Sequence, residues 1–186
     1  MIEIAHLLEE PAELSAHRAK YPAGKWDVAA FNSVRLLVKR QLNLEQGGLC
    51  VYCEVELAEE GGHVEHIRSK GRNPGLTFVY ENLAHSCDGP RHCGHRKRRQ
   101  TLPIEPRSGC NRCFAMSMID GRLEPANGLS GLEAQQASDT VSILGLNDAS
   151  LSWRRKGYAD VVLHLPAEDR ASFLRTSPFR WTLRGI

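Results

Sequence analysis

The sequence predicts an α+β protein in which a central segment of short strands lies between two helical regions. One run of apolar residues recurs at spacings of three and four, which is typical of one face of a helix; it consists of Phe31, Val34, Leu37, Val38 and Leu42. Between residues 49 and 100, short apolar runs alternate with Gly, Asn and Pro, which indicates short strands joined by turns. Helical spacing returns from residue 130 onward.

Length and composition are those of an ordinary globular protein. The chain has 186 residues, of which 41% are hydrophobic and 25% charged, so one domain with a sizeable core is expected. No apolar run approaches the roughly 18 residues that a membrane-spanning helix needs. The first residues lack the basic segment and apolar run of a secretory signal, which predicts a cytoplasmic location.

Three regions are expected along the chain: a helical region over 1–46, a central region over 47–105 and a mainly helical region over 106–186. Gly47 and Gly48 end the first long helix. Within the central region we expect strands at 49–57, 63–67 and 76–80, followed by a helix that begins in or after residues 92–99.

The last region predicts two long helices, over 130–146 and 147–165, and a shorter one near 166–175. Ser130 with Glu133 has the spacing of a capping box, and Asn147 is a candidate cap for the second helix. Pro166 suits the first turn of the third helix.

Six cysteines in a chain expected in a reducing compartment point to metal ligation or burial, because disulfides are rare there. Cys50 and Cys53 form a CxxC turn that directs two thiolates at one metal ion. Cys87 and Cys93 form a looser pair after 33 intervening residues, and the four together predict a structural Zn²⁺ site with no open position.

A third cysteine pair leaves several interpretations open. Cys110 and Cys113 form another CxxC, which could replace the pair of Cys87 and Cys93 or bind a separate ion with a histidine. Simple burial of both thiols is an equally good interpretation.

Polar residues with catalytic potential gather in the same window. Five of the eight histidines fall between His63 and His95. Glu65 and His66 stand side by side, and Asn82 follows. The segment 91–99, "RHCGHRKRR", holds five Lys or Arg and no acid, which fits either a solvated charged face or a surface that contacts phosphates.

These elements in this order resemble the HNH endonucleases in their cysteine-bearing form. The resemblance rests on "CVYCE", "VEHIRSK", "YENLAHSC" and "HCGHRKR", and it covers residues 47–105. With the later "LGLND", the chain is similar to the HNH nuclease subunit of Septu-type and retron-associated anti-phage systems, often called PtuB-like. The resemblance implies a ββα-metal (His-Me finger) core braced by the four-cysteine zinc site.

The resemblance also implies a role for each residue of the motif. His66 is expected to be the general base for hydrolysis of a phosphodiester. Glu65 and His95 are expected to ligate one divalent ion, Mg²⁺ or Mn²⁺, and Asn82 is expected to hold the His66 imidazole in position. Contacts to nucleic-acid phosphates are expected from Arg68, Lys70, Arg91, Arg96, Lys97, Arg98 and Arg99.

The chain departs from the family pattern at the helix ligand. Many cysteine-bearing members place this ligand directly after the cysteine, where this chain has Gly94, and His95 comes one position later. Lys97 competes for a place nearby, and its ammonium suits a phosphate better than a metal. His92 is a weaker candidate for either ion, and the role of His63 stays open.

Two other functions remain as alternatives. A zinc-ribbon module that binds nucleic acid or protein without cutting explains the cysteines and the basic run, but not the order of acid, His, Asn and His. Cleavage of RNA instead of DNA is the other, although the 6% aromatic content offers little for base stacking. The resemblance further implies a Septu-type ATPase partner that docks on the helical regions outside 47–105.

Overall fold

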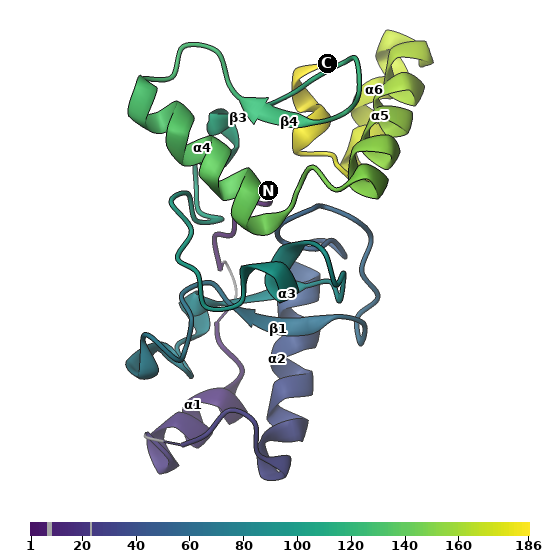
Figure 1. Ribbon diagram of the computed structural model, residues 1–186. Coiled ribbons are helices and arrows are strands. Elements are labelled where there is room, and N and C mark those ends of the chain that lie inside the picture. The colour runs from purple at the N-terminus through teal and green to yellow at the C-terminus, as the bar shows by residue number, and fades with distance from the viewer. Residues whose placement is uncertain (7–8, 23) are drawn as a thin grey trace.

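The computed structural model describes residues 1–6, 9–22 and 24–186, and it mixes helices with short strands as the sequence predicts (Figure 1). Short 3₁₀ turns connect several of the elements. In chain order the helices and strands are α1 (Ala12–Lys20), α2 (Asn32–Glu45), β1 (His63–His66), β2 (Leu83–Ser86), α3 (Cys93–Lys97), β3 (Phe114–Met116), β4 (Leu123–Pro125), α4 (Gly131–Leu144), α5 (Ala149–His164) and α6 (Ala167–Thr176).

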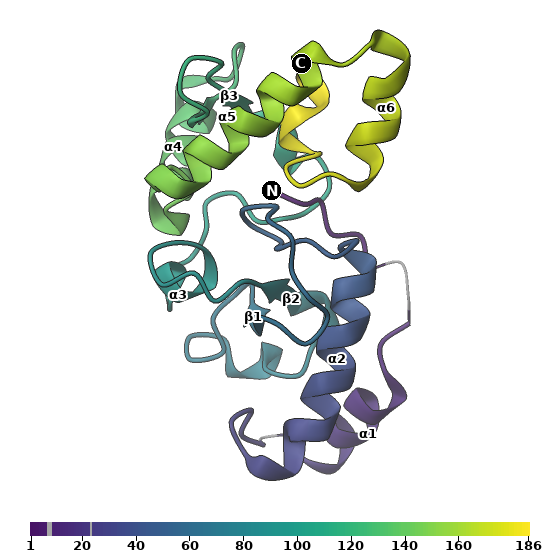
Figure 2. The ribbon, with the colours of Figure 1, turned by 90° about the vertical axis from the view of Figure 1, so that its right-hand side faces the viewer.

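The hairpin β1–β2 and helix α3 lie in the middle of the molecule, with α1 and α2 on one side and α4, α5 and α6 on the other (Figures 1 and 2). The two strands are antiparallel, with Glu65 opposite Ala84 and His66 opposite Leu83. Helix α2 packs against the hairpin, and its buried residues Val38 and Leu42 belong to an apolar cluster with both strands. The remaining buried members of this cluster are Leu14, Trp26, Phe31, Val64, Phe78, Tyr80 and Leu83.

A second apolar cluster joins the central segment to the C-terminal helices. It contains the 50–53 turn together with Leu144 of α4, Ala159 and Val162 of α5, and Phe179. The end of α4 approaches the segment before α3 closely. A Cβ added to Gly145, at the end of α4, would lie 2.5 Å from the carbonyl oxygen of Arg91. The C-terminal helices therefore pack directly on the loop that leads into α3.

The prediction of strands at 49–57 and 76–80 in the central region is wrong. Residues 49–57 form tight turns with a single bridge between Leu49 and Glu56, because the Glu54 amide donates back to the Cys50 carbonyl. Residues 76–80 are turns and 3₁₀ helix, and the second strand begins at Leu83. The apolar residues Phe78 and Tyr80 in that run are buried under α2 without pairing in a sheet.

The three C-terminal helices are confirmed, with one correction to their caps. Ser130 and Glu133 form the expected capping box at α4. Asn147 does not cap α5; Asp148 does, and the Asn147 amide instead bonds to both backbone groups of Leu123. The hairpin β3–β4 was not expected, and Asn147 anchors its second strand. Across the described part of the chain, every helix is too short or too polar to span a bilayer.

Glu54 links both ends of the chain to the cysteine turn. Its carboxylate is 1% exposed and accepts hydrogen bonds from the Met1 ammonium at 3.1 Å, the Trp181 amide at 2.8 Å and the Thr182 hydroxyl at 2.7 Å. Burial raises the pKa of Glu54, but the ammonium and Thr182 outweigh it and the pKa lies below its ordinary value. The carboxylate is therefore ionised and fully partnered.

Replacing Glu54 with Ala is expected to lower the free energy of unfolding by about 3–5 kcal/mol, because it leaves the buried Met1 ammonium without its counter-charge. Urea unfolding at fixed metal content measures the change. Glu59→Ala, at an exposed position of the same segment, is the control and is expected to stay within about 0.5 kcal/mol of the parent. Equal stability of the two variants would contradict the proposed anchor.

Candidate metal centres and active-site cleft

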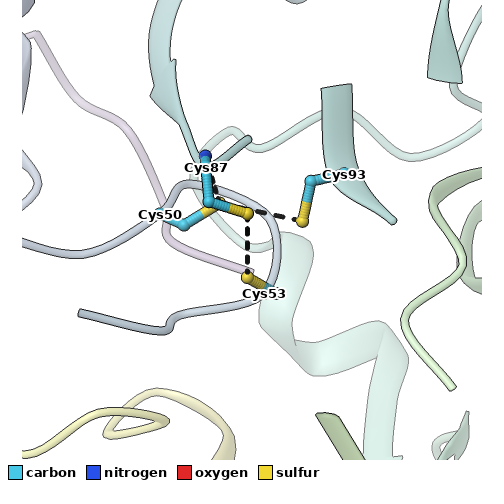
Figure 3. Close-up of side chains that lie close together, drawn as sticks. All are labelled: Cys50, Cys53, Cys87 and Cys93. Atoms are coloured by element: carbon cyan, nitrogen blue, oxygen red, sulfur yellow. Dashed lines mark hydrogen bonds between the residues drawn. The ribbon is translucent and has the colours of Figure 1, made fainter. Parts of the chain in front are cut away.

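Cys50, Cys53, Cys87 and Cys93 converge into one buried group that could hold a metal ion (Figure 3). Two of the sulfur separations, Cys50 to Cys93 and Cys53 to Cys87, are 3.8 Å. Four sulfurs about 2.3 Å from a tetrahedral Zn²⁺ lie about 3.8 Å apart. Both the donor set and the spacing therefore fit zinc, with every ligand position taken by protein.

Backbone and side-chain nitrogens close to the cysteines contact their sulfur atoms. The Cys87 amide donates to the Cys50 sulfur at 3.3 Å, and His92 Nδ1 lies 3.2 Å from the Cys93 sulfur. Cys93 has a φ of 59° and Glu54 a φ of 61°, a left-handed conformation that is uncommon for residues other than Gly. Hydrogen bonds from the neighbouring thiols lower the pKa of Cys87 below its ordinary value, which favours the thiolate that a metal binds.

Cys110 and Cys113 stand apart from this group. They lie in a 3₁₀ turn (Cys110–Cys113) and are both buried, and within residues 1–6, 9–22 and 24–186 they belong to no cluster of three or more metal-ligating side chains. Burial raises the pKa of Cys110 to about 11, so that residue stays a thiol. This arrangement fits the interpretation that the third pair is buried rather than metal-binding.

Glu65 lies at the centre of the second candidate site, with its two carboxylate oxygens in different environments. Oε1 is 2.7 Å from Lys97 Nζ and accepts from the Tyr52 hydroxyl at 3.4 Å, whereas Oε2 is 3.4 Å from His63 Nε2. Burial raises the pKa of Glu65, but His63 and Lys97 lower it by more, so the pKa lies below its ordinary value. Glu65 is therefore an ionised, largely buried carboxylate.

The expected phosphate contact from Lys97 is wrong, because this side chain does not reach the surface. Its relative exposure is 0%, and Nζ donates to the His66 carbonyl at 3.0 Å in addition to its ion pair with Glu65. Only the charge pattern is visible in the sequence, and the helix turns this one basic residue of the run inward. Lys97 instead neutralises Glu65.

His66 is held in one orientation beside Glu65. Its Nε2–H donates to the Thr77 carbonyl at 3.0 Å, which leaves Nδ1 as the ring's acceptor. The indole of Trp26 packs edge-on against the imidazole with ring centroids 4.6 Å apart. Burial lowers the pKa of His66 to about 4, so the ring is neutral at pH 7 and able to accept a proton.

Asn82 is connected to His66 through a loop. Its Oδ1 accepts from the Arg68 amide at 2.8 Å, and its Nδ2 donates to the carbonyls of Arg68 at 2.9 Å and Leu76 at 3.2 Å. Leu76 directly precedes Thr77, whose carbonyl accepts the hydrogen bond from His66 Nε2–H. The amide therefore closes the 68–77 loop around the imidazole.

His95 faces a residue that sequence reasoning missed. His95 Nε2 lies 3.2 Å from Asp88 Oδ1, and His63 Nδ1 lies 2.9 Å from the same oxygen. These three side chains form a second group able to hold a metal ion. Asp88 could have been found from its place directly after Cys87, and His63 from its place two residues before Glu65 on the same face of a strand.

The site opens into a cleft of about 630 Å³ that contains His63, Glu65, His66 and Gly94. A larger cleft of about 1040 Å³ runs along α3 and α4 and shares His95 and Arg98 with the first. Basic residues line both clefts; in the first they are Arg35, Lys39, Lys70, Arg98 and Arg99, and in the second Arg91, Arg96, Arg98 and Arg122.

Several of the predicted phosphate contacts are already engaged with protein. Arg68 is paired with Glu105, Lys70 with Asp27 and Arg91 with Asp148. Arg96 donates to the Ser142 carbonyl of α4 at 3.0 Å. Arg98 and Arg99 are exposed where the first cleft meets solvent, so they offer the most accessible charge beside Glu65 and His66.

The chain is 32% identical over 171 residues to the proposed HNH endonuclease of retron Vc95 from Vibrio cholerae serotype O1 biovar El Tor. The similarity covers 84% of this chain and 83% of that protein. No protein-family model matches the chain. On the strength of this relative, the chain belongs to the HNH endonuclease family.

Exchanging Cys53 for Ser is expected to abolish stoichiometric zinc and to unfold the central region, because a four-thiolate site cannot close with one sulfur missing. Elemental analysis and thermal unfolding measure the two effects. Cys113→Ser is the matched control from the other CxxC, expected to retain one zinc per chain. Loss of zinc from the Cys113 variant, or two ions per parent chain, would contradict the assignment.

Proposed function

We propose that this protein is a metal-dependent HNH endonuclease that hydrolyses phosphodiester bonds. One observation carries the proposal: an ionised Glu65 and a neutral, oriented His66 stand side by side in a cleft that has free arginines at its mouth. A buried carboxylate suits a divalent ion, and an imidazole with a free lone pair suits proton abstraction from water.

The core of this nuclease is proposed to be a zinc-braced ββα-metal unit within residues 47–105. Strand β1 carries both Glu65 and His66, β2 pairs with it, and α3 begins at Cys93 of the second cysteine pair. The regions 1–46 and 106–186 flank this core and pack on it through the two apolar clusters. The four cysteines would hold Zn²⁺ in a structural role only, since all four positions are filled.

In the proposed reaction, His66 Nδ1 takes a proton from the water that attacks the phosphorus. The Nε2–H bond to Thr77 fixes the tautomer, and the 68–77 loop closed by Asn82 fixes the direction of the ring. Bound Mg²⁺ or Mn²⁺ supplies charge neutralisation at the scissile phosphate and at the leaving 3′ oxygen. Glu65 would provide a carboxylate ligand, and the resemblance to the family assigns the next ligand to His95.

We propose DNA as the substrate, positioned by its backbone. Arg98 and Arg99 line the cleft beside Glu65 and His66, and we propose that they contact phosphates on either side of the scissile bond. Such contacts orient a nucleic acid without reading its sequence. The alternative substrate, RNA, is separated by offering both nucleic acids under the same conditions.

The name of the Vibrio cholerae relative supports a proposal about biological context. That protein is named for a retron, and we propose that the present chain likewise serves as the nuclease of an anti-phage defence system. A Septu-type ATPase is the proposed partner. The helices α4, α5 and α6 carry no residue of the proposed catalytic group, so they are free to dock it.

His66→Ala is expected to abolish plasmid nicking in Mg²⁺ or Mn²⁺, with a rate loss of about 10²–10⁴-fold, because the general base is gone. Zinc content and DNA affinity are expected to be unchanged, which elemental analysis and a gel-shift titration measure. A parent protein that never cuts DNA or RNA, even with its ATPase partner present, would sink the nuclease proposal in favour of a binding module.

Removing Arg98 and Arg99 together is expected to weaken DNA binding and to reduce the slope of log affinity against log salt by about 2, since each arginine neutralises about one phosphate. Fluorescence anisotropy at several salt concentrations measures the slope. The paired residues Arg68 and Arg91 provide the comparison: because each already has a carboxylate partner, their double substitution is expected to change the slope less.

A further inference from the structure

We infer that His63, rather than His95, is the histidine that shares the divalent ion with Glu65, and that Asp88 holds His63 in place for this task. The inference rests on the proposed nuclease function and names the ligands of its ion. Both side chains come from strand β1, two residues apart on one face, so this ion would be bound by the strand instead of by strand and helix together.

The donor atoms of His63 and Glu65 already lie close to the spacing of two ligands on one ion. His63 Nε2 and Glu65 Oε2 are 3.4 Å apart. In an octahedral Mg²⁺ site with bonds of about 2.1 Å, neighbouring ligand atoms are about 3.0 Å apart, so a shift of about 0.4 Å suffices. His95 Nε2 is directed to Asp88, and among the described residues no contact joins His95 to Glu65.

Helix α3 has no side chain at position 94, where it faces Glu65 and His63. A Cβ added to Gly94 would lie 2.6 Å from Glu65 Oε2 and 2.6 Å from His63 Nε2. Position 94, which in many cysteine-bearing members carries the helix ligand, therefore points at the same two donor atoms. Here the His63 imidazole and the Glu65 carboxylate together fill the space that a side chain at position 94 would need, which accounts for the glycine.

The other ring nitrogen of His63 has a carboxylate partner. His63 Nδ1 lies 2.9 Å from Asp88 Oδ1. A histidine that binds a metal through one nitrogen commonly donates the other N–H to a carboxylate, which fixes the ring and makes it a better ligand. With Nδ1–H bonded to Asp88, Nε2 faces Glu65 Oε2, and an ion bound between these two atoms would take the place of the Nε2 proton. His95 Nε2–H donates to the same oxygen, Asp88 Oδ1, at 3.2 Å and helps to hold that carboxylate in place.

The charges around the ion position are consistent with a site completed by substrate. Glu65 and Asp88 bring two negative charges, and Lys97 removes one through its pair with Glu65 Oε1. Mg²⁺ sites with one or two carboxylates keep several waters and use substrate phosphates as further ligands. We therefore expect weak binding of the ion alone and tighter binding with nucleic acid present.

Mn²⁺ binding to the zinc-loaded, full-length protein tests the ligand assignment without any cleavage assay. His63→Ala is expected to weaken Mn²⁺ affinity roughly tenfold or more and to remove the imidazole nitrogen signal from the spin-echo modulation of bound Mn²⁺. His95→Ala, the matched histidine on the same carboxylate, is expected to keep that signal. The opposite result for the two histidines, or loss of the signal in neither, would overturn the inference.

Two further variants separate a positioning Asp88 from a ligating one. Asp88→Asn can still accept the Nδ1–H bond, so it is expected to weaken Mn²⁺ binding less than Asp88→Ala. Equal and large losses for both, together with a loss for His95→Ala, would place the ion among His63, Asp88 and His95 and would contradict the inference.

The exchange of positions can be tested by rescue. His63→Ala combined with Gly94→His moves the imidazole from the strand to the helix, and this double variant is expected to regain Mn²⁺ binding and the nitrogen signal. Because a Cβ at position 94 would still lie 2.6 Å from Glu65 Oε2, His63→Ala combined with Gly94→Ala is the control for displacement of that carboxylate. A histidine double variant that binds no better than this control would contradict the inference. Zinc content and thermal stability report whether each variant is folded, and plasmid nicking by the parent protein separately tests the nuclease function.

Discussion

The geometry of the candidate site depends on four sulfur atoms that meet between the hairpin and the helix. Helix α3 has only five residues, too few to be stable by its own hydrogen bonds. Its first residue, Cys93, shares the sulfur group with the 50–53 turn and with Cys87 at the end of β2. The contact of Cys93 with the other three cysteines fixes the distance of α3 from the strands. It thereby sets the positions of Gly94 and Lys97 relative to Glu65.

A buried carboxylate in such a place is costly unless its charge is balanced. Lys97 and His63 share that task, one on each oxygen of Glu65. Because Lys97 is a buried residue of the protein itself, its ion pair partly neutralises the Glu65 carboxylate before any metal ion binds. The same side chain also holds the His66 carbonyl, so one ammonium supports both neighbouring residues of the proposed active site.

The sequence predicted those parts of the molecule that repeat with a regular period or that stand close along the chain. The helical spacing located α2, α4 and α5, and adjacency located Glu65 with His66. The sequence did not predict that Asp88 lies between His63 and His95. These contacts join three separate segments, namely β1, the loop after β2 and α3. The spacing of apolar residues alone likewise could not separate a strand from the buried turns at 49–57 and 76–80.

The inward orientation of Lys97 shows the limit of reading charge from a linear run. In "HRKRR" every basic residue looks equivalent, but the helix places Lys97 at 0% exposure while Arg96, Arg98 and Arg99 face solvent. Only the three-dimensional partner, Glu65, explains why a lysine is tolerated there. Orientation around a short helix is set by where its first residue is anchored, and here the anchor is the buried Cys93 in the four-cysteine group.

Gly94 carries a consequence for how this site can vary among related proteins. Any side chain at position 94 competes with the His63 imidazole for one volume beside Glu65 Oε2. The two positions therefore cannot both hold a large side chain, and we expect them to covary. A histidine or asparagine directly after the cysteine that corresponds to Cys93 should accompany a small or outward-facing residue at the position of His63. Glycine at one position and histidine at the other would then mark a distinct lineage of the site.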